Sequence, residues 1–287
     1  MAILLDGKAL SKKYQEHITR EVEELKLKYN KIPGLAVVMA GNNPASQVYV
    51  KKKDKMSLKS GMNSRQIHLP EDVSEEKLLD IINELNMDET IHGILVQLPL
   101  PEHINTEKIL LSIRPEKDVD GFHPVNLGKL LAGMEPYAIP CTPLGIIKML
   151  EDYNIDLKGK NTTVIGRSNI VGKPVSLLLL AKHATVTLCH SRTRDIEGIC
   201  RRSDVIVAAL GRPKFVKADW VKEGAVIVDV GINRLEDTGK LCGDVDFKNV
   251  EPKASYITPV PGGVGPMTIA MLLDNTLRLF KKSLDKE

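Results

Sequence analysis

The sequence predicts an α/β protein with two domains, each a parallel sheet of βαβ units, the second of Rossmann type. Three observations support this fold class. Short apolar runs typical of strands alternate with longer segments of helical periodicity along the chain. At 287 residues, the chain is long enough for two modest domains with separate cores. A glycine-containing loop also follows one strand directly and precedes a helix.

The expected strands are seven apolar runs, in the order residues 35–39, 67–69, 93–98, 162–165, 185–189, 205–209 and 225–230. The spacing of apolar residues predicts helices over residues 8–28, 44–60, 74–85, 106–113, 144–153 and 173–182, and a last helix from about Thr268. Prolines cluster just before the helix at residues 144–153, so a domain boundary is expected near residues 137–143.

Charge and composition exclude several classes of function. The net charge is +3 at pH 7 and 4% of residues are aromatic, so neither a nucleic-acid-binding surface nor a base-stacking platform is indicated. The four cysteines are scattered, as in reduced cytosolic proteins, and no apolar run is long enough to span a membrane. We therefore expect a cytoplasmic protein that binds neither nucleic acid nor membrane, although the mature form of an organellar protein would share these features.

The segment Ile257–Thr268 is rich in proline and glycine and is expected to be a rigid loop. Proline fixes φ and removes backbone donors, whereas Gly262 and Gly263 permit left-handed conformations and close approach of a ligand. In this loop, Pro261 stands directly before the two glycines. The loop therefore suits the binding of a flat ligand through its main chain. The alternative is a tight connection between two elements.

Tyr49 and Lys53 are four residues apart in a segment of helical character, so they should lie on one helix face. A phenol and an ammonium could then converge on one substrate. The alternative is a solvated basic helix, because several more lysines surround this pair.

Gln97 is a polar residue at the end of an apolar strand, where open α/β sheets bind ligands. A site explains an amide at this position better than the core does. Asp118 and Asp120 follow in a turn-rich loop. Two carboxylates without further ligands make a weak metal site, and the histidines share no ligand spacing, so no metal is expected.

The strand at residues 162–165 leads into a loop in which Gly166 and Gly172 permit a tight turn before a helix. That geometry aims helix N-terminal amides at a pyrophosphate. The loop departs from the G-x-G-x-x-G fingerprint, because Ser168 replaces the middle glycine and the last glycine comes one residue later. As a fingerprint alone it is weak.

The choice of cofactor is predicted from the end of the following strand. An NAD site usually offers a carboxylate there to the ribose hydroxyls. Here Ser191 and Arg192 follow the strand and Arg167 lies in the glycine loop, so a 2′-phosphate would meet hydroxyl and guanidinium groups. We predict NADP as the cofactor. The alternative is that Arg192 faces solvent and Arg167 alone pairs with the phosphate.

Six motifs in order give the chain a resemblance to the bifunctional methylenetetrahydrofolate dehydrogenase/methenyltetrahydrofolate cyclohydrolase family. They are Tyr49-Val50-x-x-Lys53, Val96-Gln97-Leu98-Pro99-Leu100-Pro101, Lys117-Asp118-Val119-Asp120-Gly121, Pro140-Cys141-Thr142-Pro143, Gly166-Arg167-Ser168-x-x-Val171-Gly172 and Pro259-Val260-Pro261-Gly262-Gly263-Val264-Gly265-Pro266. The resemblance covers nearly the whole chain. It implies a homodimer, and a last helix that packs back on the first domain. The expected domains are therefore residues 1–138 with 268–287 for folate binding, and 139–267 for NADP, with the catalytic cleft between them.

The resemblance also implies the chemistry: NADP-dependent oxidation of methylenetetrahydrofolate to the methenyl cation, then hydrolysis to formyltetrahydrofolate. Lys53 is the candidate for proton transfer in the hydrolysis, and an ordinary lysine is protonated at neutral pH, so the site must favour the neutral amine. Gln97 would hold Lys53 and the reacting oxygen in register, and Tyr49 would contact the p-aminobenzoate region. Asp120 would pair with the pterin donors, because a carboxylate presents two acceptors.

The remaining expected contacts rest on the same resemblance. Leu98 and the loop residues Pro261, Gly262 and Gly263 are expected to contact the folate. Ile232 is assigned to the nicotinamide side of the pocket, and Thr142 is preferred to Cys141 as a cofactor contact. Asp118 is expected to support the loop. Two alternatives differ in class: another two-domain NADP-dependent dehydrogenase, which would not need Tyr49, Lys53, Gln97 and Asp120 together, and a non-catalytic nucleotide sensor or scaffold, against which an intact Lys53 beside the cofactor loop argues.

Overall fold

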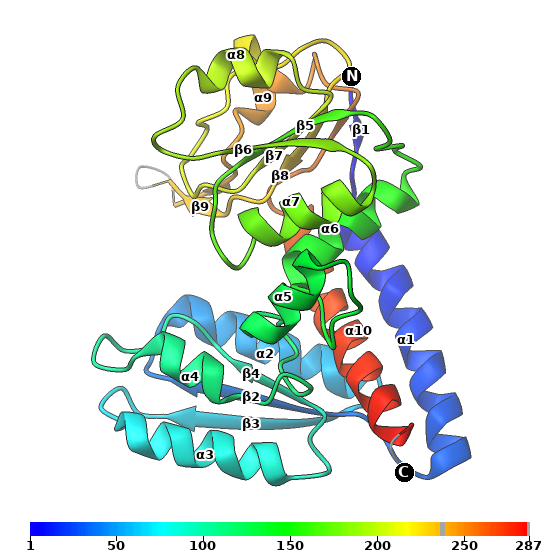
Figure 1. The fold of residues 1–287 in the computed structure, drawn as a ribbon, viewed down its shortest axis with the longest axis vertical. Helices are drawn as coiled ribbons and strands as arrows, with labels where there is room; N and C mark the ends of the chain where they lie inside the picture. Colours follow the sequence, from blue (N-terminus) through cyan, green and yellow to red (C-terminus); the bar gives the residue numbers. More distant parts are fainter. Residues whose placement is uncertain (236–238, 286–287) are drawn as a thin grey trace. The chain divides into compact units, whose positions relative to one another are not determined.

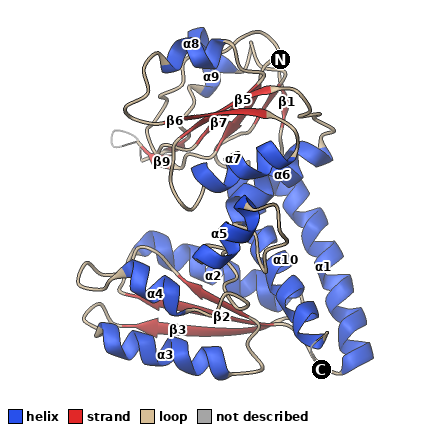
Figure 2. Cartoon of the chain, viewed as in Figure 1, coloured by secondary structure: helices blue, strands red, loops and turns tan. Residues whose placement is uncertain are grey.

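The structure is a computed structural model that describes residues 1–235 and 239–285, apart from the side chain of Ala45. The chain divides into two compact units. We call residues Lys13–Cys141 and Ile269–Glu287 the three-stranded unit, and Met1–Lys12 and Thr142–Thr268 the six-stranded unit. Both contain parallel strands and helices, so the predicted α/β fold class is confirmed (Figures 1 and 2). Residues 236–238 and 286–287, which the predicted domain ranges include, lie outside the described residues.

The three-stranded unit is built on a parallel sheet in the order β3-β2-β4. Its strands are β2 (Gly34–Ala40), β3 (Asn63–Leu69) and β4 (Gly93–Val96). Every residue of the central strand β2 is buried, which explains its sequence of glycine and apolar residues only. Its helices are α2 (Pro44–Lys59), α3 (Glu75–Met87), α4 (Thr106–Ser112) and α5 (Pro124–Leu131), with most of α1 (Gly7–Tyr29) and α10 (Val264–Leu284).

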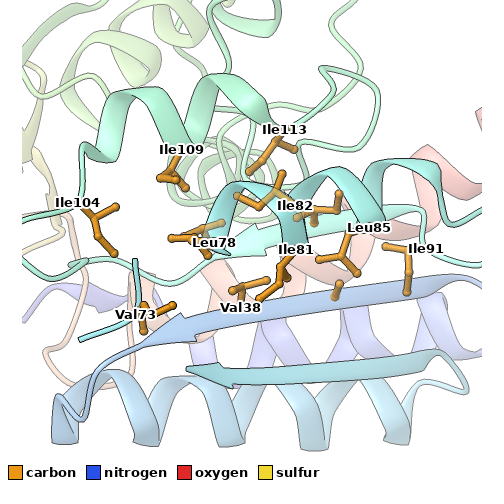
Figure 3. Close-up of a cluster of buried hydrophobic side chains, with 14 residues drawn as sticks. Val38, Val73, Leu78, Ile81, Ile82, Leu85, Ile91, Ile104, Ile109 and Ile113 are labelled. Atoms are coloured by element: carbon orange, nitrogen blue, oxygen red, sulfur yellow. The ribbon is translucent and has the colours of Figure 1, made fainter. Parts of the chain in front are cut away.

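One face of this sheet carries the core shown in Figure 3. Ser74 begins α3 by accepting a hydrogen bond from the backbone N–H of Lys77, as an N-cap serine should. The buried positions of α3 then recur at helical spacing and pack with Val38 of β2 and Ile109 of α4. Burying each such side chain contributes about 1.5–3 kcal/mol. The α3 residues in this core are Leu78, Ile81, Ile82 and Leu85.

A second cluster joins the long helices α1 and α10. Ile18 and Val22 of α1 pack with Leu277 and Phe280 of α10, all of them buried. The ring of Phe280 meets His92 edge to face, with 4.7 Å between ring centroids. From Ile269 onward, helix α10 is therefore part of the core of the three-stranded unit.

The six-stranded unit has a parallel sheet in the order β1-β11-β8-β7-β5-β6. Its strands are β1 (Ile3–Leu4), β5 (Asn161–Ile165), β6 (Thr185–Cys189), β7 (Val205–Ala208), β8 (Val226–Asp229) and β11 (Tyr256–Ile257). Its other elements are α6 (Cys141–Asp152), α7 (Gly172–Ala181), α8 (Ile196–Arg201), the 3-10 helix η1 (Ala218–Trp220), α9 (Phe247–Val250) and the antiparallel pair β9 (Asn233–Arg234) and β10 (Leu241–Cys242).

The strand order places a topological switch at β5. From β5 the chain goes to β6 on one side and then returns to β7 on the other. In open α/β sheets, ligands bind outside the carboxyl ends of the strands at such a point. The loop that leaves β5 at this position is the glycine-containing loop at residues 166–172.

Two differences from the sequence prediction have simple causes. The prediction gave residues 1–138 to the first domain, but β1 is the edge strand of the six-stranded sheet, where the N–H of Ile3 donates to the carbonyl of Ser255 at 2.8 Å. Helix α10 begins at Val264 rather than near Thr268. Pro266 is tolerated there because the first turn of a helix has no internal partners for its N–H groups.

The sequence prediction also missed short elements, among them α5 and α8, which have eight and six residues. Among residues 1–235 and 239–285, no helix combines the length and apolar character needed to cross a bilayer.

Candidate active site

Lys53 and Gln97 are brought together at the carboxyl end of the three-stranded sheet. Lys53 lies on α2, which follows β2, and Gln97 comes directly after β4, the neighbour of β2. The Nζ of Lys53 donates to the Oε1 of Gln97 at 3.0 Å. Only 9% of Lys53 is exposed, so the ammonium is held in a nearly buried position by a neutral amide. No carboxylate forms an ion pair with it in the described part of the chain.

Gln97 is itself fixed at both ends. Its backbone N–H continues the pairing with the sheet by donating to the carbonyl of Val38 at 2.8 Å. Its Nε2 donates to the carbonyl of Leu98 at 2.8 Å, which leaves Oε1 facing Lys53. The same Leu98 carbonyl accepts from the hydroxyl of Ser46 at 3.5 Å. The surrounding hydrogen bonds therefore hold the amide in one orientation.

Tyr49 lies one turn before Lys53 on α2 and is 37% exposed. Partial burial raises the pKa of its phenol above the ordinary value. The helical spacing thus places the two side chains on one face of α2, as predicted, with the phenol accessible and the ammonium recessed.

Asp120 stands in a loop that Asp118 organises. The carboxylate of Asp118 accepts from the N–H of Gly121 at 3.1 Å, the N–H of His123 at 2.8 Å and the Nδ2 of Asn126 at 2.9 Å. These bonds agree with the expectation that Asp118 supports the loop. The Oδ1 of Asp120 lies 3.8 Å from the Sγ of Cys141.

Electrostatics single out Asp120. Burial raises the pKa of its carboxyl to about 6, although the positive charge of Lys53 acts in the opposite direction. Burial also raises the pKa of the Cys141 thiol well above its ordinary value, so Cys141 is a neutral packed thiol. Lys53, Gln97, Asp120 and Cys141 therefore form one partly desolvated polar cluster in the three-stranded unit.

In the six-stranded unit, the glycine loop has the backbone geometry that sequence analysis expected. Gly166 has φ +119°, and a β-carbon on Gly172 would lie 1.9 Å from the carbonyl oxygen of Gly166. Only glycine fits at these two positions. The Oγ of Ser168 accepts from the N–H groups of Val171 at 3.2 Å and Gly172 at 3.3 Å, so the serine that replaces the middle glycine stabilises the start of α7.

The side chains predicted to select the cofactor are exposed beside this loop. The loops after β5 and β6 start side by side, because Ile165 pairs with Cys189 and the N–H of Gly166 donates to the Cys189 carbonyl at 2.9 Å. Within the described residues, the guanidinium groups of Arg167 and Arg192 have no hydrogen-bond or ion-pair partner. Ser191 is exposed in the same turn. These groups and the glycine loop fit a nucleotide with an additional phosphate.

Two buried aspartates near Ile232 were not predicted. Asp244 accepts from the consecutive N–H groups of Leu210, Gly211 and Arg212 at 2.7, 2.9 and 2.8 Å, and so holds the loop after β7. Asp229, at the end of β8, accepts from the N–H groups of Asp244 and Val245, each at 2.9 Å. Burial raises the pKa of Asp229 to about 7.

Ile232, which is half exposed, follows β8 three residues after Asp229. The only sequence signals for the aspartate pair were the nearby glycines, Gly231 and Gly243, whose β-carbons would collide with the carboxylates.

The proline- and glycine-rich loop belongs to the six-stranded unit. Pro261 is exposed, and Gly262 has φ +111°. The start of α1 contacts this loop. The N–H of Lys8 donates to the Gly262 carbonyl at 2.9 Å, and Gly7 packs so closely against Gly263 that no side chain would fit at position 7. Thr142, at the start of α6, shares a 2.9 Å hydrogen bond with Thr268.

Comparison with known proteins decides which family this site belongs to. A family model described as the tetrahydrofolate dehydrogenase/cyclohydrolase catalytic domain matches residues 5–120, and one described as the NAD(P)-binding domain of the same family matches residues 140–284. The chain belongs to the tetrahydrofolate dehydrogenase/cyclohydrolase family. Its resemblance to this family, predicted from six motifs, is confirmed.

Full-length relatives of this tetrahydrofolate dehydrogenase/cyclohydrolase chain agree with that assignment. The bifunctional protein FolD of Streptococcus thermophilus is 56% identical over 284 residues, which cover 99% of each chain. The crystal structure of the bifunctional FolD of Campylobacter jejuni superposes with a TM-score of 0.96 at 53% identity, covering 99% of this chain and 100% of that one. FolD of Trypanosoma brucei, solved with NADP and an inhibitor, has a TM-score of 0.95 at 42% identity, covering 99% and 98%.

The two family-model matches contain the residues predicted for the two sites. The catalytic-domain match contains Tyr49, Lys53, Gln97 and Asp120, and the NAD(P)-binding match contains the glycine loop with Arg167 and Arg192. The NAD(P)-binding match also extends through α10 to residue 284, although most of that helix packs in the three-stranded unit.

Proposed function

We propose that this chain catalyses two consecutive reactions on a folate one-carbon unit. The first is the NADP-dependent oxidation of 5,10-methylenetetrahydrofolate to 5,10-methenyltetrahydrofolate, and the second is hydrolysis of the methenyl product to 10-formyltetrahydrofolate. The observation that carries the proposal is the Lys53–Gln97 hydrogen bond in a member of this family, with Asp120 in the same desolvated cluster. The FolD relatives of similar length support both activities.

The hydrolysis needs a group that can take and return a proton. Water adds to the cationic methenyl carbon and loses a proton, and the C–N5 bond then breaks as N5 gains one. Neutral Lys53 would accept the proton from the attacking water and, as an ammonium, return it to N5. Gln97 holds Nζ in place through a neutral amide, so it orients the amine toward the reacting groups without adding a negative charge.

Asp120 and Tyr49 would bind the two ends of the folate ring system. A carboxylate can accept two hydrogen bonds from the amide and amino groups of a pterin edge, and burial raises the pKa of Asp120 in this site to about 6. Tyr49, with its exposed phenol ring on the same helix face as Lys53, suits contact with the p-aminobenzoate region. Leu98 and the loop residues Pro261, Gly262 and Gly263 would add contacts to the folate.

For the oxidation, bound NADP supplies the nicotinamide that accepts a hydride from the bridge carbon. The chain's own task is to hold the two reactants. Gly166 and Gly172 allow the pyrophosphate to approach the start of α7, and Arg167, Ser191 and Arg192 would bind the 2′-phosphate. Ser168 would hold the loop in shape, while Thr142 and Ile232 would line the nicotinamide side.

We further propose that the protein works in the cytoplasm as a homodimer. Scattered cysteines, three of them buried, support a reducing compartment. A dimer follows from the family resemblance, and sedimentation analysis of the purified protein would decide it.

The proposal is tested by supplying methylenetetrahydrofolate with NADP or with NAD and following both nucleotide reduction and the methenyl product. We expect faster reduction of NADP, and methenyl consumption above the spontaneous rate of hydrolysis. The alternative, another NADP-dependent two-domain dehydrogenase, would reduce NADP with a different substrate and leave methenyltetrahydrofolate untouched.

A further inference from the structure

Two segments of the three-stranded unit meet beside Asp120. Gly121, with φ +72°, lies so close to the second segment that a β-carbon would be 2.6 Å from the backbone nitrogen of Pro140. The thiol of Cys141 lies 3.5 Å from the carbonyl oxygen of Val119 and 3.8 Å from the Oδ1 of Asp120. The position of the Asp120 carboxyl is thus defined by how residues 119–121 sit against residues 139–141.

One side chain ties these segments together, and it comes from the far end of the chain. Asn275, fully buried on α10, donates from Nδ2 to the carbonyls of Val119 at 2.9 Å and Ile139 at 2.8 Å, and lies 3.5 Å from the Sγ of Cys141. Its partners are therefore the residue before Asp120 and two residues of the facing segment.

Chemistry fixes the orientation of this amide. Backbone carbonyls only accept hydrogen bonds, so Nδ2 and not Oδ1 must face Val119 and Ile139. The Oδ1 of Asn275 is then left buried without a partner among the described residues. The unpaired buried Oδ1 costs about 1–3 kcal/mol, which roughly offsets what the two donated hydrogen bonds contribute, so stability alone does not explain an asparagine here.

We propose that Asn275 is a positioning residue for folate binding. By hydrogen-bonding to both Val119 and Ile139, it holds residues 119–121 against residues 139–141 and so sets the position of the Asp120 carboxyl. The inference rests on the proposed folate function. Asp118 holds the loop internally through Gly121, His123 and Asn126, so the loop keeps its own shape without Asn275. Without Asn275, the position of the loop relative to Cys141 would change, and the position of the Asp120 carboxyl would change with it.

The test compares Asn275→Ala with Thr276→Ala. Thr276 is the matched control, because it is equally buried on the same helix and, among the described residues, its hydroxyl bonds only to the carbonyl of Leu272 within α10. We expect Asn275→Ala to raise the KM for the folate about ten- to a hundred-fold with a smaller change in kcat, since an ångström-scale displacement of a binding group can cost this much. Thr276→Ala should change KM less than about twofold.

A second readout does not depend on folate turnover. Native labelling of Cys141 by a thiol reagent, followed by peptide mass spectrometry, reports whether residues 139–141 have separated from the loop. Faster labelling in Asn275→Ala than in Thr276→Ala is expected. If Asn275→Ala fails to fold, Asn275→Ser, which keeps one donor, should fold and show an intermediate KM.

Equal KM values and equal labelling in the asparagine variant and its control would overturn the role of Asn275. Absence of folate turnover in the parent protein would instead remove the proposed function, while the labelling would still decide whether Asn275 holds the two segments together.

Discussion

Lys53 and Gln97 are joined by a 3.0 Å hydrogen bond across 44 residues of sequence. The sheet order makes this contact possible, because β2 and β4 are neighbours and both residues follow these strands at the same edge. The bond holds a nearly buried ammonium against a neutral acceptor. A neutral partner matters because a carboxylate would stabilise the ammonium and oppose its deprotonation.

Gln97→Glu tests the requirement for a neutral partner directly. The new carboxylate would pair with the ammonium of Lys53, so we expect cyclohydrolase activity to fall at least about tenfold at neutral pH. The rate of methenyltetrahydrofolate consumption measures the effect. Gln66→Glu, an exposed change of the same type on β3, is the control and should leave that rate unchanged. Full activity in the Gln97 variant would show that a neutral amide is unnecessary.

Asp120→Asn should make stability less dependent on pH. The pKa of Asp120 is raised from 3.8 to about 6 by burial, so the folded state holds this proton more tightly than the unfolded state. The stabilisation is complete below about pH 4 and is lost as pH rises through about 6, a change of about 3 kcal/mol. The parent protein loses this contribution between pH 4 and pH 7 and the Asp120→Asn variant does not, so the variant should gain stability relative to the parent over that range.

Urea unfolding of both proteins at several pH values measures this difference in the free energy of unfolding. The same substitution should raise the KM for the folate, because an amide presents one acceptor and not two. A stability difference that does not vary with pH would contradict the assignment of a buried, raised-pKa carboxyl at this position.

Arg192→Ala is expected to weaken NADP binding about ten- to a hundred-fold while leaving NAD binding unchanged. The reason is the loss of charge-assisted hydrogen bonds to the 2′-phosphate, which only NADP carries. Calorimetric dissociation constants for both nucleotides check the prediction. Arg194→Ala, a neighbouring exposed arginine, serves as control. A normal NADP constant for Arg192→Ala together with a weakened one for Arg167→Ala would assign the phosphate to Arg167 alone.

Gly172→Ala should abolish tight NADP binding, because its β-carbon would lie 1.9 Å from the carbonyl oxygen of Gly166 and force the loop open. Gly128→Ala is the contrasting change. Gly128 lies in α5 with open space around it, and alanine favours a helix by up to about 1 kcal/mol. We expect unchanged NADP binding and slightly higher stability for Gly128→Ala. Tight NADP binding by Gly172→Ala would contradict the close-packed geometry of this loop.

The sequence was most informative where one local signal was strong. Strand β2 and strands β5, β7 and β8 of the six-stranded sheet contain apolar runs, and their positions were predicted to within a few residues. Strand β1 gave no such signal, because it is two residues long and forms through pairing with β11. The start of α10 was misplaced because proline in a first turn resembles a loop.

The candidate site shows the same contrast. Tyr49 and Lys53 could be placed on one helix face from their spacing, whereas the approach of Gln97 to Lys53 depends on the strand order. Asn275 gave no recognisable pattern, and the only signals for Asp229 and Asp244 were the nearby glycines Gly231 and Gly243. Their partners are mostly backbone groups, which every sequence offers, so only the fold reveals which ones they meet.

The most direct test of the account is the fate of methenyltetrahydrofolate with Lys53→Ala, compared with the exposed neighbour control Lys52→Ala. We expect the Lys53 variant to bind NADP normally and to consume the methenyl compound no faster than its spontaneous hydrolysis, while Lys52→Ala matches the parent. Equal enzymatic consumption by Lys53→Ala and the parent would contradict the assignment of proton transfer to Lys53, and with it the proposed active site.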